Sequence, residues 1–557
     1  MTSRDQADHG WSHEVDLLVV GSGAGGMTAA LTGAFAGLDT LLVEKAPVYG
    51  GTTALSGGGI WVPNNPTLEQ AGIVDPEERV VEYLEHLTRG RVDRARLQAY
   101  AHEGPAMFRM FRDRARHLEF SWCPGYSDYH PEAPGGRPEG RSVECPPFDA
   151  RKLGELADTQ RGSHMKVPGG LVITSADYVH LNMITRTWRG RRTALKLAVR
   201  SLVSRLLRRR MVSLGQSLVA RLRLSLADAG VPVWLDTPLL DLVRDESGTV
   251  VGAVVARDGA ATRIRARMGV VIASGGFDHN EALRKEHLPE IGRDDLSGGA
   301  ETNTGDGIVA GQAVGAAVDL LDDAWWMPSI RKPEGRVHAL VSERSIPNSV
   351  IVTPDGERFT NEASPYVTFV HAQIAGGHPH LWFVMDQTAR RRYPFGAVVP
   401  GKDFPDSWYA AGLVHKADTL VALAGEIGVP AETLESSVAR FNGLVATGHD
   451  TDHGRGESAY DRYYGDPTLA NPVLGPVQEP PFLAVRIQAG DLGTKGGLLT
   501  DEAGRVLDGD GQPIPGLYAT GNAAASVMGN DYAGAGATIG PAMVFGYVAA
   551  RHAAGER

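Results

Sequence analysis

A glycine-rich turn near the start of the chain constrains the fold more than any other feature. Residues 15–20 (VDLLVV) form a short apolar run of the buried-strand kind. A helix-like stretch of small residues covers 27–36, and a second strand-like run at 40–43 ends at Glu44. Between the first run and the helix lies a sequence that satisfies G-x-G-x-x-G, Gly21-Ser22-Gly23-Ala24-Gly25-Gly26. Strand, glycines, helix, strand and acid in this order predict the dinucleotide-binding unit of a Rossmann-like α/β domain.

Each part of this unit has a physical role in holding a dinucleotide. Gly21 allows the tight turn, Gly23 lets the backbone approach a pyrophosphate, and Gly26 lets the helix pack closely on the strand. The N-terminus of the helix supplies free N–H groups and the positive end of the helix dipole. Glu44 lies about twenty residues further on, where a carboxylate accepts a hydrogen bond from a ribose hydroxyl.

The segment that follows Glu44 favours FAD over NAD as the dinucleotide. It reads KAPVYGGTTALSGGG over residues 45–59, and this second loop of Gly, Thr and Ser would be surplus in a simple NAD domain. A flexible surface loop is the alternative interpretation. In flavoproteins of the succinate dehydrogenase and fumarate reductase type, a similar loop wraps the pyrophosphate and the flavin edge. The resemblance implies FAD contacts from Lys45, Gly51, Thr52, Thr53, Ser56, Gly57 and Gly58.

Two later segments resemble the closing motifs of the same flavoproteins. Residues 268–274 (MGVVIAS) form a strand-like run before Gly275, and residues 516–520 (GLYAT) lead into Gly521 and Asn522. The resemblance implies that Gly521 and Asn522 approach the ribityl-phosphate portion of FAD. It also implies cofactor contacts from Gly275, Asp306 and Ile539.

This arrangement predicts a discontinuous FAD-binding domain. We expect it to comprise residues 1–290 plus 486–557, with the basic segment 186–210 attached to it. An inserted α+β catalytic domain, residues 291–485, then caps the flavin. The sequence carries no sign of covalent attachment, so FAD is expected to bind non-covalently.

Composition and charge exclude several other classes of protein. The formal net charge is -11, which disfavours nucleic acid as a partner, because such binding needs a strongly basic surface. Two cysteines, Cys123 and Cys145, fit a reducing cytosol better than a disulfide framework. The polar residues 1–16 predict no signal peptide, and no apolar run is long enough to span a bilayer. The histidines show no metal-ligand spacing such as HExxH, and no GxSxG elbow indicates a hydrolase. We therefore expect a cytoplasmic protein without a metal.

Residues 186–210 form a strongly basic stretch. It holds ten Lys or Arg and no acid, while apolar residues recur at helical spacing: Leu195, Val199, Leu202, Val203, Leu206 and Leu207. This composition is typical of an amphipathic helix that lies in a membrane interface. A surface helix that packs on its own domain by the apolar stripe fits equally well. Peripheral membrane contact is therefore one of two open interpretations.

Several motifs together resemble those of the 3-ketosteroid Δ1-dehydrogenases. They are residues 124–129 (PGYSDY), 303–307 (NTGDG), 361–366 (NEASPY), 491–497 (DLGTKGG), 529–536 (GNDYAGAG) and 540–543 (GPAM). The similarity covers nearly the whole chain, from residue 15 to residue 553. Enzymes of this family introduce a 1,2 double bond into the A ring of a 3-ketosteroid. The resemblance thus implies an FAD-dependent oxidoreductase of steroid catabolism that passes electrons to an external acceptor.

The resemblance also implies roles for four residues. Tyr532 and the backbone N–H of Gly536 bind the C3 carbonyl. Tyr366 removes a proton from C2, Tyr129 assists it through a hydrogen bond, and flavin N5 takes hydride from C1. Elementary chemistry agrees, because a C–H beside a ketone is acidic only when the enolate oxygen is stabilised by an oxyanion hole. A tyrosine base titrates near about 10 when free, so it needs a nearby donor or a positive field.

The chain departs from the family pattern around the proposed oxyanion site. Relatives often read Tyr-Pro-Gly-Pro-Gly where this chain has Tyr532-Ala533-Gly534-Ala535-Gly536, and loss of both prolines predicts a looser loop. His130 stands where many relatives carry a second Tyr. Asp531 would oppose enolate formation if it pointed inward, so we expect it to point away.

Other assignments stay open at the level of sequence. Tyr126 competes with Tyr129 for the assisting role, and three aromatic residues either line an apolar steroid slot or pack in the core: Trp325, Trp326 and Phe369. A 3-ketosteroid Δ4-(5α)-dehydrogenase shares the fold and the flavin, but the motif at Tyr129 favours the 1,2 reaction. A fumarate reductase-like enzyme needs an Arg and His clamp for a dicarboxylate, with Arg344 and Arg358 as candidates. A non-catalytic flavoprotein needs neither an oxyanion hole nor matched tyrosines.

Overall fold

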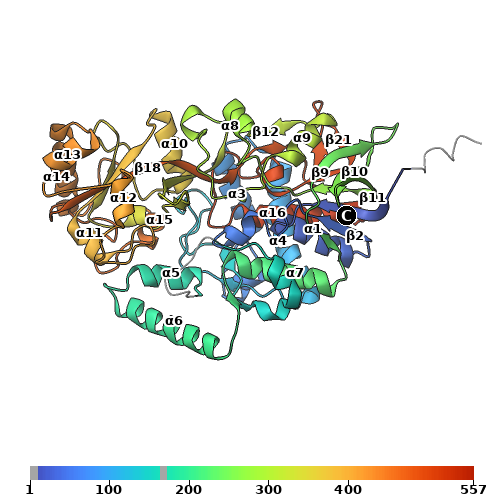
Figure 1. Ribbon diagram of the computed structural model, residues 1–557, viewed down its shortest axis with the longest axis horizontal. Helices are drawn as coiled ribbons and strands as arrows, with labels where there is room; N and C mark the ends of the chain where they lie inside the picture. Colours follow the sequence, from blue (N-terminus) through green and yellow to red (C-terminus); the bar gives the residue numbers. More distant parts are fainter. Residues whose placement is uncertain (1–9, 164–171, 557) are drawn as a thin grey trace, which may run out of the picture.

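The computed structural model describes residues 10–163 and 172–556 of the chain. Part of the polar segment 1–16, on which the expectation of no signal peptide rests, lies outside the described residues. An eight-stranded sheet and a six-stranded sheet lie toward opposite ends of the long axis, the former on the right of Figure 1. Together they confirm the predicted α/β class with a second, separate sheet.

The eight-stranded sheet contains the predicted strand–helix–strand unit. β1 (His13–Val20) pairs in parallel with β2 (Thr40–Val43) on one side and with β11 (Ala260–Ile272) on the other. The last four residues of β1 are buried, as expected of a central parallel strand covered on both faces. The order is β20-β21-β11-β1-β2-β8, with β10 on β11 and β9 on β10. The remaining strands are β8 (Val233–Trp234), β9 (Leu239–Arg244), β10 (Val250–Arg257), β20 (Arg505–Leu507) and β21 (Pro513–Ala519).

The first and last helices of the chain pack against each other beside this sheet. α1 (Ala24–Phe35) and α16 (Ile539–Ala553) approach closely through two glycines. A Cβ added at Gly25 would lie 2.8 Å from the carbonyl oxygen of Ala542, and one at Gly546 would lie 2.4 Å from that of Gly25. Side chains at either glycine would separate the helices. The contact therefore brings the C-terminal motif beside the N-terminal glycine turn (Figure 1).

The six-stranded sheet is antiparallel and has the order β14-β13-β18-β16-β15, with β17 paired to β18. Its strands are β13 (Ala324–Arg331), β14 (Val337–Ala339), β15 (Ser349–Val352), β16 (Leu381–Met385), β17 (Val414–Ala417) and β18 (Phe482–Thr494). α10 (Tyr366–Ala375) packs on β13, while α13 (Leu420–Ile427) and α14 (Ala431–Thr447) pack on β17 and β15. The predicted domain boundary at 485/486 falls inside β18, and the division into domains stays a prediction.

The other strands of the described residues pair in smaller sheets. The strands are β3 (Ile60–Trp61), β4 (Ser121–Trp122), β5 (Ser142–Glu144), β6 (Phe148–Asp149), β7 (Met211–Val212), β12 (Val318–Asp319) and β19 (Gly497–Leu498). The helices are α2 (Pro66–Gln70), α3 (Glu77–Thr88), α4 (Arg94–Arg114), α7 (Gly215–Asp228), α8 (Glu281–His287), α9 (Asp306–Ala313), α11 (Gln387–Arg392), α12 (Asp406–Ala410) and α15 (Ala459–Tyr463). β3, β4 and β5 form a small sheet that carries Trp61 beneath the tyrosine-rich region described below.

Helix α6 (Trp188–Leu206) lies at the margin of the molecule, next to α5 (Ser175–Asn182) (Figure 1). Its predicted apolar stripe faces solvent, since Leu195, Leu202 and Leu206 are 67%, 58% and 74% exposed. The interpretation that this stripe packs on the protein is therefore wrong. Within the described ranges, no helix is both long enough and apolar enough to cross a membrane.

Candidate active site

The glycine turn after β1 has the geometry that its motif predicts. Gly21 has a φ of +107°, and a Cβ there would lie 2.3 Å from the carbonyl oxygen of Ala273. A Cβ at Gly26 would lie 2.0 Å from the carbonyl oxygen of Gly21, so the helix can begin this close to the strand only with glycine. Above Gly23, by contrast, the nearest atom to an added Cβ is the Thr53 hydroxyl at 3.7 Å. The turn thus leaves room at the N-terminus of α1, where a pyrophosphate would be held.

The acid at the end of β2 is buried beside this turn. The Ser22 N–H and hydroxyl donate to one carboxylate oxygen of Glu44 at 3.0 and 2.5 Å, and the Ala46 N–H donates to the other at 2.9 Å. These bonds fix the carboxylate next to the glycine turn. Its contact with a ribose hydroxyl stays a prediction.

The second Gly/Thr/Ser loop is folded against the first motif. The Ala24 N–H, at the start of α1, donates to the Thr53 hydroxyl at 3.1 Å. The Thr52 hydroxyl accepts from the Ala300 N–H at 3.0 Å and the Asn303 side chain at 2.9 Å. These contacts run to two distant parts of the chain, so the segment is an ordered wall of the site rather than a loose surface loop. Gly51, Ser56, Gly57 and Gly58 lie in the same wall, and Gly58 has a φ of +70°.

Lys45 and Asp306, predicted as separate cofactor contacts, bind each other. The ammonium donates to the Asp306 carboxylate at 2.8 Å and to the Thr304 hydroxyl at 2.6 Å. Gly275 lies close by with a φ of +81°, and a Cβ there would lie 2.7 Å from the Asn303 side chain. The pair therefore joins the second loop to the N-terminus of α9 at the rim of the site.

The C-terminal contacts reach the site from the other side. Gly521 and Asn522 follow β21, and the Asn522 side-chain oxygen accepts from the Trp325 indole at 3.1 Å. Ile539 is the first residue of α16. A cavity between these elements is lined by residues that include Trp325, Thr520, Gly521, Asn522, Thr538 and Phe545. Open glycine backbone, a helix N-terminus and a buried acid at one place are the features that an FAD molecule needs, so the residues fit the cofactor.

Three predicted tyrosines meet beside this cavity. The Tyr129 hydroxyl donates to the Tyr366 hydroxyl at 2.8 Å. The ring centroid of Tyr532 lies 4.9 Å from that of Tyr129 and 5.4 Å from that of Tyr366, with the rings edge-on. Tyr129 comes from a loop, Tyr366 starts α10 and Tyr532 lies in the loop before α16, so three distant segments supply the cluster. Tyr126 accepts a hydrogen bond from Tyr464 at 2.8 Å, stacks on Tyr463 and also has a side-chain hydrogen bond with Tyr129.

Gly536 lies next to Tyr532 at the edge of the cluster. It has a φ of +96°, and a Cβ there would lie 2.3 Å from the backbone of Gly59. Burial raises the pKa of Tyr532, while hydrogen bonds with Tyr366, Thr538 and the Gly536 backbone lower it. A raised pKa keeps the Tyr532 hydroxyl protonated, which a donor to a ketone oxygen requires. The Gly536 backbone thus lies within hydrogen-bond reach of the Tyr532 hydroxyl, and their joint role as the two donors of an oxyanion hole stays a prediction.

Burial also dominates the proposed base. It raises the pKa of Tyr366 well above the ordinary range for tyrosine, and the neighbouring tyrosines Tyr532, Tyr126 and Tyr460 add to the rise. The hydrogen bond from Tyr129 acts in the opposite direction and lowers it. This hydrogen bond acts in the direction that the sequence analysis required but does not outweigh burial, and the assisting role of Tyr129 stays a prediction.

The sequence analysis missed a buried charge network next to Tyr129. Arg141 binds Asp75 at 2.8 and 2.9 Å and also binds Asp128, the residue before Tyr129. The Trp61 indole donates to Asp128 at 2.8 Å. Asp128 lies inside the matched motif PGYSDY, which gave a signal for the segment but not for the distant arginine.

Lys495, near Tyr532, is a second charged group that the sequence analysis missed. The fully buried Lys495 binds Asp323 at 3.2 Å, stands 4.7 Å from the centre of the Trp325 indole and donates to the Asp531 carbonyl oxygen at 3.2 Å. Trp325 in turn lies 4.9 Å from Tyr532, so it borders the site. Trp326 donates to Asp323 and packs in the core. Phe369 is likewise buried, against Phe359.

The departures around Tyr532 are coupled to one another. The Asp531 carboxylate lies 2.8 Å from His130 Nε2 and accepts from the Tyr532 N–H at 2.8 Å. The expected looseness of the loop is countered by anchors on its carbonyl groups. Ala533 accepts from the Tyr83 hydroxyl at 2.7 Å and from the Tyr129 N–H at 3.0 Å. Ala535 accepts from the Ser142 hydroxyl at 2.8 Å.

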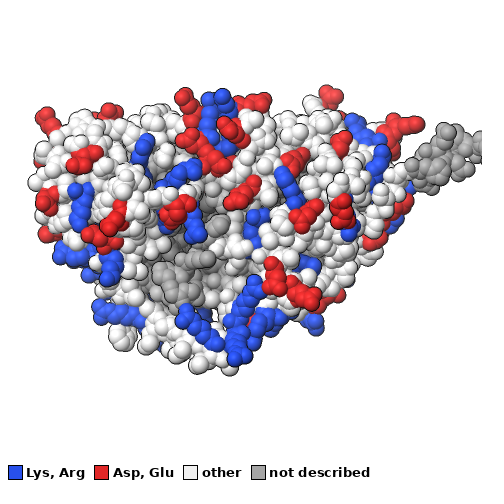
Figure 2. Space-filling model, viewed as in Figure 1, with Lys and Arg blue, Asp and Glu red and all other residues white. Residues whose placement is uncertain are grey.

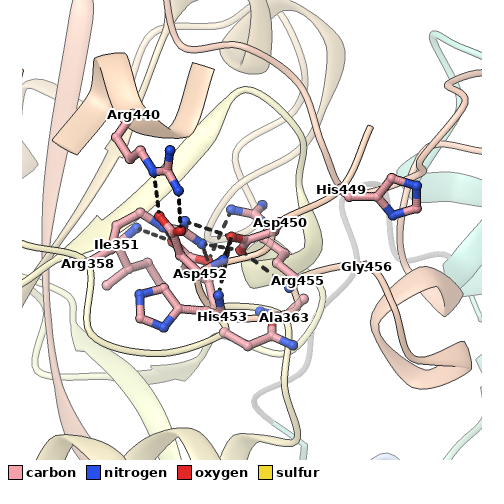
Figure 3. Close-up of polar contacts among 12 residues, drawn as sticks. Ile351, Arg358, Ala363, Arg440, His449, Asp450, Asp452, His453, Arg455 and Gly456 are labelled. Carbon is pink, nitrogen blue, oxygen red and sulfur yellow. Dashed lines mark hydrogen bonds and ion pairs between the residues drawn. The ribbon is translucent and has the colours of Figure 1, made fainter. Parts of the chain in front are cut away.

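The two candidates for a dicarboxylate clamp are already bound within the protein. Arg344 is buried and donates to the carbonyl groups of Leu340, Glu362 and Ser364. Arg358 donates to Glu362. It also donates to Asp450, which accepts from the Arg455 N–H as well (Figure 3). Both arginines therefore hold the polypeptide around α10 rather than an empty anion site.

Comparison with known proteins gives this site a family. The model of the family described as FAD binding domain matches residues 16–539. A 3-oxosteroid 1-dehydrogenase of Mycobacterium tuberculosis is 46% identical over 558 residues, covering 98% of this chain and 99% of the relative. The crystal structure of 3-ketosteroid Δ1-dehydrogenase from Sterolibacterium denitrificans, in complex with 1,4-androstadiene-3,17-dione, has a TM-score of 0.92 at 38% identity, covering 98% of this chain and 100% of that chain.

A more distant match shows the fold alone. The crystal structure of 3-ketosteroid Δ4-(5α)-dehydrogenase from Rhodococcus jostii, in complex with 4-androstene-3,17-dione, has a TM-score of 0.69 at 21% identity, with 99% of this chain and 98% of that chain covered. Fold, glycine motifs and family model together define an FAD-dependent oxidoreductase. Within that class, the chain belongs to the family of 3-oxosteroid 1-dehydrogenases.

Proposed function

We propose that this protein desaturates the 1,2 bond of 3-ketosteroids. The observation that carries the proposal is the cluster formed by the Tyr129, Tyr366 and Tyr532 rings, with the Gly536 backbone at Tyr532. Such a site fits a flat, largely apolar ring system whose one polar handle is a ketone. The 46% identity with a 3-oxosteroid 1-dehydrogenase over almost the whole chain supports the same substrate class.

The residues divide the reaction between them. Tyr532 and the Gly536 N–H donate to the C3 oxygen and stabilise the negative charge that develops there. Tyr366 takes the proton from C2, and Tyr129 holds its hydroxyl in position. Bound FAD supplies the acceptor for the hydride that leaves C1, and the C1–C2 double bond forms as both hydrogens depart. Removal of one proton and one hydride balances the two-electron oxidation of the steroid.

The flavin contacts complete the proposal. Non-covalent FAD would lie with its pyrophosphate at Gly21 to Gly26 and its ribose at Glu44. The ribityl-phosphate portion would lie at Gly521 and Asn522, with Gly275 and the N-terminus of α16 at Ile539 beside it. The Gly/Thr/Ser loop from Gly51 to Gly58 would cover the opposite side.

The partners follow from this chemistry. They are a 3-ketosteroid and an external electron acceptor, and the net charge of -11 argues against nucleic acid. We also propose a cytoplasmic location with peripheral membrane contact. The buried free thiols of Cys123 and Cys145 support the reducing compartment, and the exposed apolar stripe of α6 supports the membrane contact.

Anaerobic titration of the purified yellow protein with androst-4-ene-3,17-dione tests the proposal. We expect the visible flavin band to bleach while the 1,4-diene appears. Absence of bleaching, with a 5α-saturated 3-ketosteroid then giving the 4-ene, would establish the Δ4 reaction instead. No flavin reduction by any 3-ketosteroid would contradict the roles assigned to the tyrosines but would not affect the assignment of the FAD site.

A further inference from the structure

Exposed apolar side chains of the described chain concentrate on one helix. Of thirteen large apolar residues that are strongly exposed, seven lie between residues 188 and 207: Trp188, Leu195, Val199, Leu202, Val203, Leu206 and Leu207. Scattered surface leucines are ordinary, whereas more than half of the exposed large apolar residues within one short segment, residues 188–207, mark a surface that contacts something else.

Six of these residues form a stripe along α6. Successive residues of an α-helix are turned by about 100°, and on α6 the six from Trp188 to Leu206 fall within an arc of about 100°. The residues of α6 that are buried, Gly190 and Leu197, lie on the opposite side of the helix. The helix therefore rests on the protein by one side and turns its apolar side outward.

Positive charge borders the stripe. By the same turn of about 100° per residue, Arg191 and Arg205 fall along one edge and Arg189 and Lys196 along the other, while the exposed Arg192 falls within the stripe. Residues 208–210 continue the positive charge beyond the helix, and the chain has no Asp or Glu between residues 178 and 227. Lys and Arg accordingly gather over α6 along the lower edge of Figure 2. An exposed indole, Trp188, stands at the start of the helix, and such rings favour the boundary between lipid and water.

Both ends of the helix are held to the body of the protein. Before it, Arg186 binds Asp466 at 2.5 Å. After it, Arg151 donates to the Leu207 carbonyl oxygen at 3.1 Å and Arg210 binds Asp158 at 2.9 Å. These contacts fix the direction in which the stripe faces, so the surface is presented without rearrangement.

We propose that α6 and residues 207–210 form a docking surface for a bilayer that contains anionic phospholipid. The apolar stripe enters the boundary between headgroups and acyl chains, and the basic edges bind phosphate groups on either side. A second copy of this chain fits the charges poorly, because a symmetric contact would bring the same basic edges together. Docking would place the enzyme at the phase in which a sparingly soluble apolar substrate accumulates.

Co-sedimentation of the full-length flavoprotein with vesicles tests the proposal. Vesicles of phosphatidylcholine mixed with phosphatidylglycerol are compared with vesicles of phosphatidylcholine alone. We expect binding to the mixed vesicles to be at least about tenfold stronger and to weaken as salt is raised, because screening reduces the attraction of the basic edges.

The variant L202D/L206D places two charges in the middle of the stripe. We expect it to lose at least about tenfold of its vesicle affinity. The matched control is V399D/V421D, which changes two apolar residues that are 44% and 50% exposed elsewhere on the surface. Equal FAD content and far-UV circular dichroism of the two variants establish that both are folded.

Each outcome decides the matter. Unchanged vesicle binding of L202D/L206D, or no binding by the natural protein, would overturn the proposal. Equal binding to both kinds of vesicle would remove the selectivity for anionic lipid. A natural dimer that L202D/L206D dissociates in sedimentation velocity would assign the stripe to self-association. Flavin reduction by dissolved steroid, measured without vesicles, is expected to be the same in both variants, so failure of docking and failure of the proposed activity are told apart.

Discussion

Two neighbouring regions of the molecule are built in opposite ways. The flavin cradle comprises the glycine turn at residues 21–26 and the Gly/Thr/Ser loop at residues 51–58, and the tyrosine cluster comprises Tyr129, Tyr366 and Tyr532. The cradle consists mainly of backbone, with glycines at Gly21 and Gly26 whose replacement would collide with neighbouring atoms at 2.3 and 2.0 Å. The cluster consists of three side chains that project from segments separated by up to 403 residues, Tyr129 to Tyr532. The cradle depends on the absence of side chains at its glycines, and the cluster depends on single hydroxyl groups.

This difference separates the consequences of mutation. A change in the cradle alters the shape of the backbone and should cost cofactor or folding. Removal of a hydroxyl from the cluster leaves ring packing intact, because Tyr129, Tyr366 and Tyr532 still contact one another through their edges. It should therefore cost catalysis alone.

The largest effect is expected for Tyr366→Phe. Loss of the base should lower the rate of flavin reduction by steroid about 10²- to 10⁴-fold at unchanged FAD content. Since burial raises the pKa of Tyr366, the rate of the natural enzyme should climb as pH rises through the alkaline range, and the variant should lose this climb. Stopped-flow reduction over a pH series measures both. Tyr409→Phe, which changes a tyrosine of α12 outside the cluster, is the control; a fast Tyr366→Phe enzyme would assign the base elsewhere.

The second-largest effect is expected at Gly536, which contacts both regions. Gly536→Ala places a methyl group 2.3 Å from Gly59, in the Gly/Thr/Ser loop, at a φ of +96°. Backbone strain of about 1–3 kcal/mol should shift the oxyanion donor and lower activity about 10- to 100-fold, with a lower thermal midpoint. Gly443→Ala in α14, where an added Cβ meets no atom within 4 Å, should change neither. An active, stable Gly536→Ala enzyme would show that the loop does not depend on this close approach.

The two regions also differ in how far the sequence alone predicts them. The cradle could be read from local spacing, because each glycine has a steric reason that acts within a few residues, as at Gly21 and Gly26. The cluster could be named only by resemblance to a family, since no local rule brings Tyr129 to Tyr366. Arg141 and Lys495 were not assigned a role, because their partners Asp75 and Asp323 lie 66 and 172 residues away and no spacing rule connects them. The apolar stripe of α6 was recognised, but its direction depends on what the folded helix rests upon.

A smaller, cofactor-specific effect is expected in the cradle at Glu44. Glu44→Gln keeps the size of the side chain but removes the charge that accepts from Ser22 and Ala46 and, in the proposal, from a ribose hydroxyl. Charge-assisted hydrogen bonds of about 1.5–3 kcal/mol predict a loss of FAD affinity of about 10- to 100-fold. Fluorescence titration of the apoprotein with FAD measures it. At saturating FAD, the rate of steroid oxidation should be nearly natural; a rate that stays low would place Glu44 in the catalytic region as well.

The smallest effect probes the border between the regions, where His130 pairs with Asp531 beside Tyr532. Burial raises the pKa of Asp531, but the hydrogen bond and charge of His130 together with the Tyr532 N–H and Lys495 lower it overall. A depressed carboxyl pKa stabilises the fold above the unfolded value of about 3.9, and this stability is lost as pH falls through the folded pKa. His130→Phe should therefore lower the free energy of unfolding by about 1 kcal/mol at neutral pH and by less below about pH 4.

The same variant should also lower the rate. Because Asp531 accepts from the Tyr532 N–H, the rate should fall about fivefold, as about 1 kcal/mol at the transition state implies. Thermal midpoints across pH and steady-state kinetics test both, with His449→Phe, an exposed histidine paired with Glu457, as the control. A stability loss without any change in rate would confine the pair to the fold of the loop.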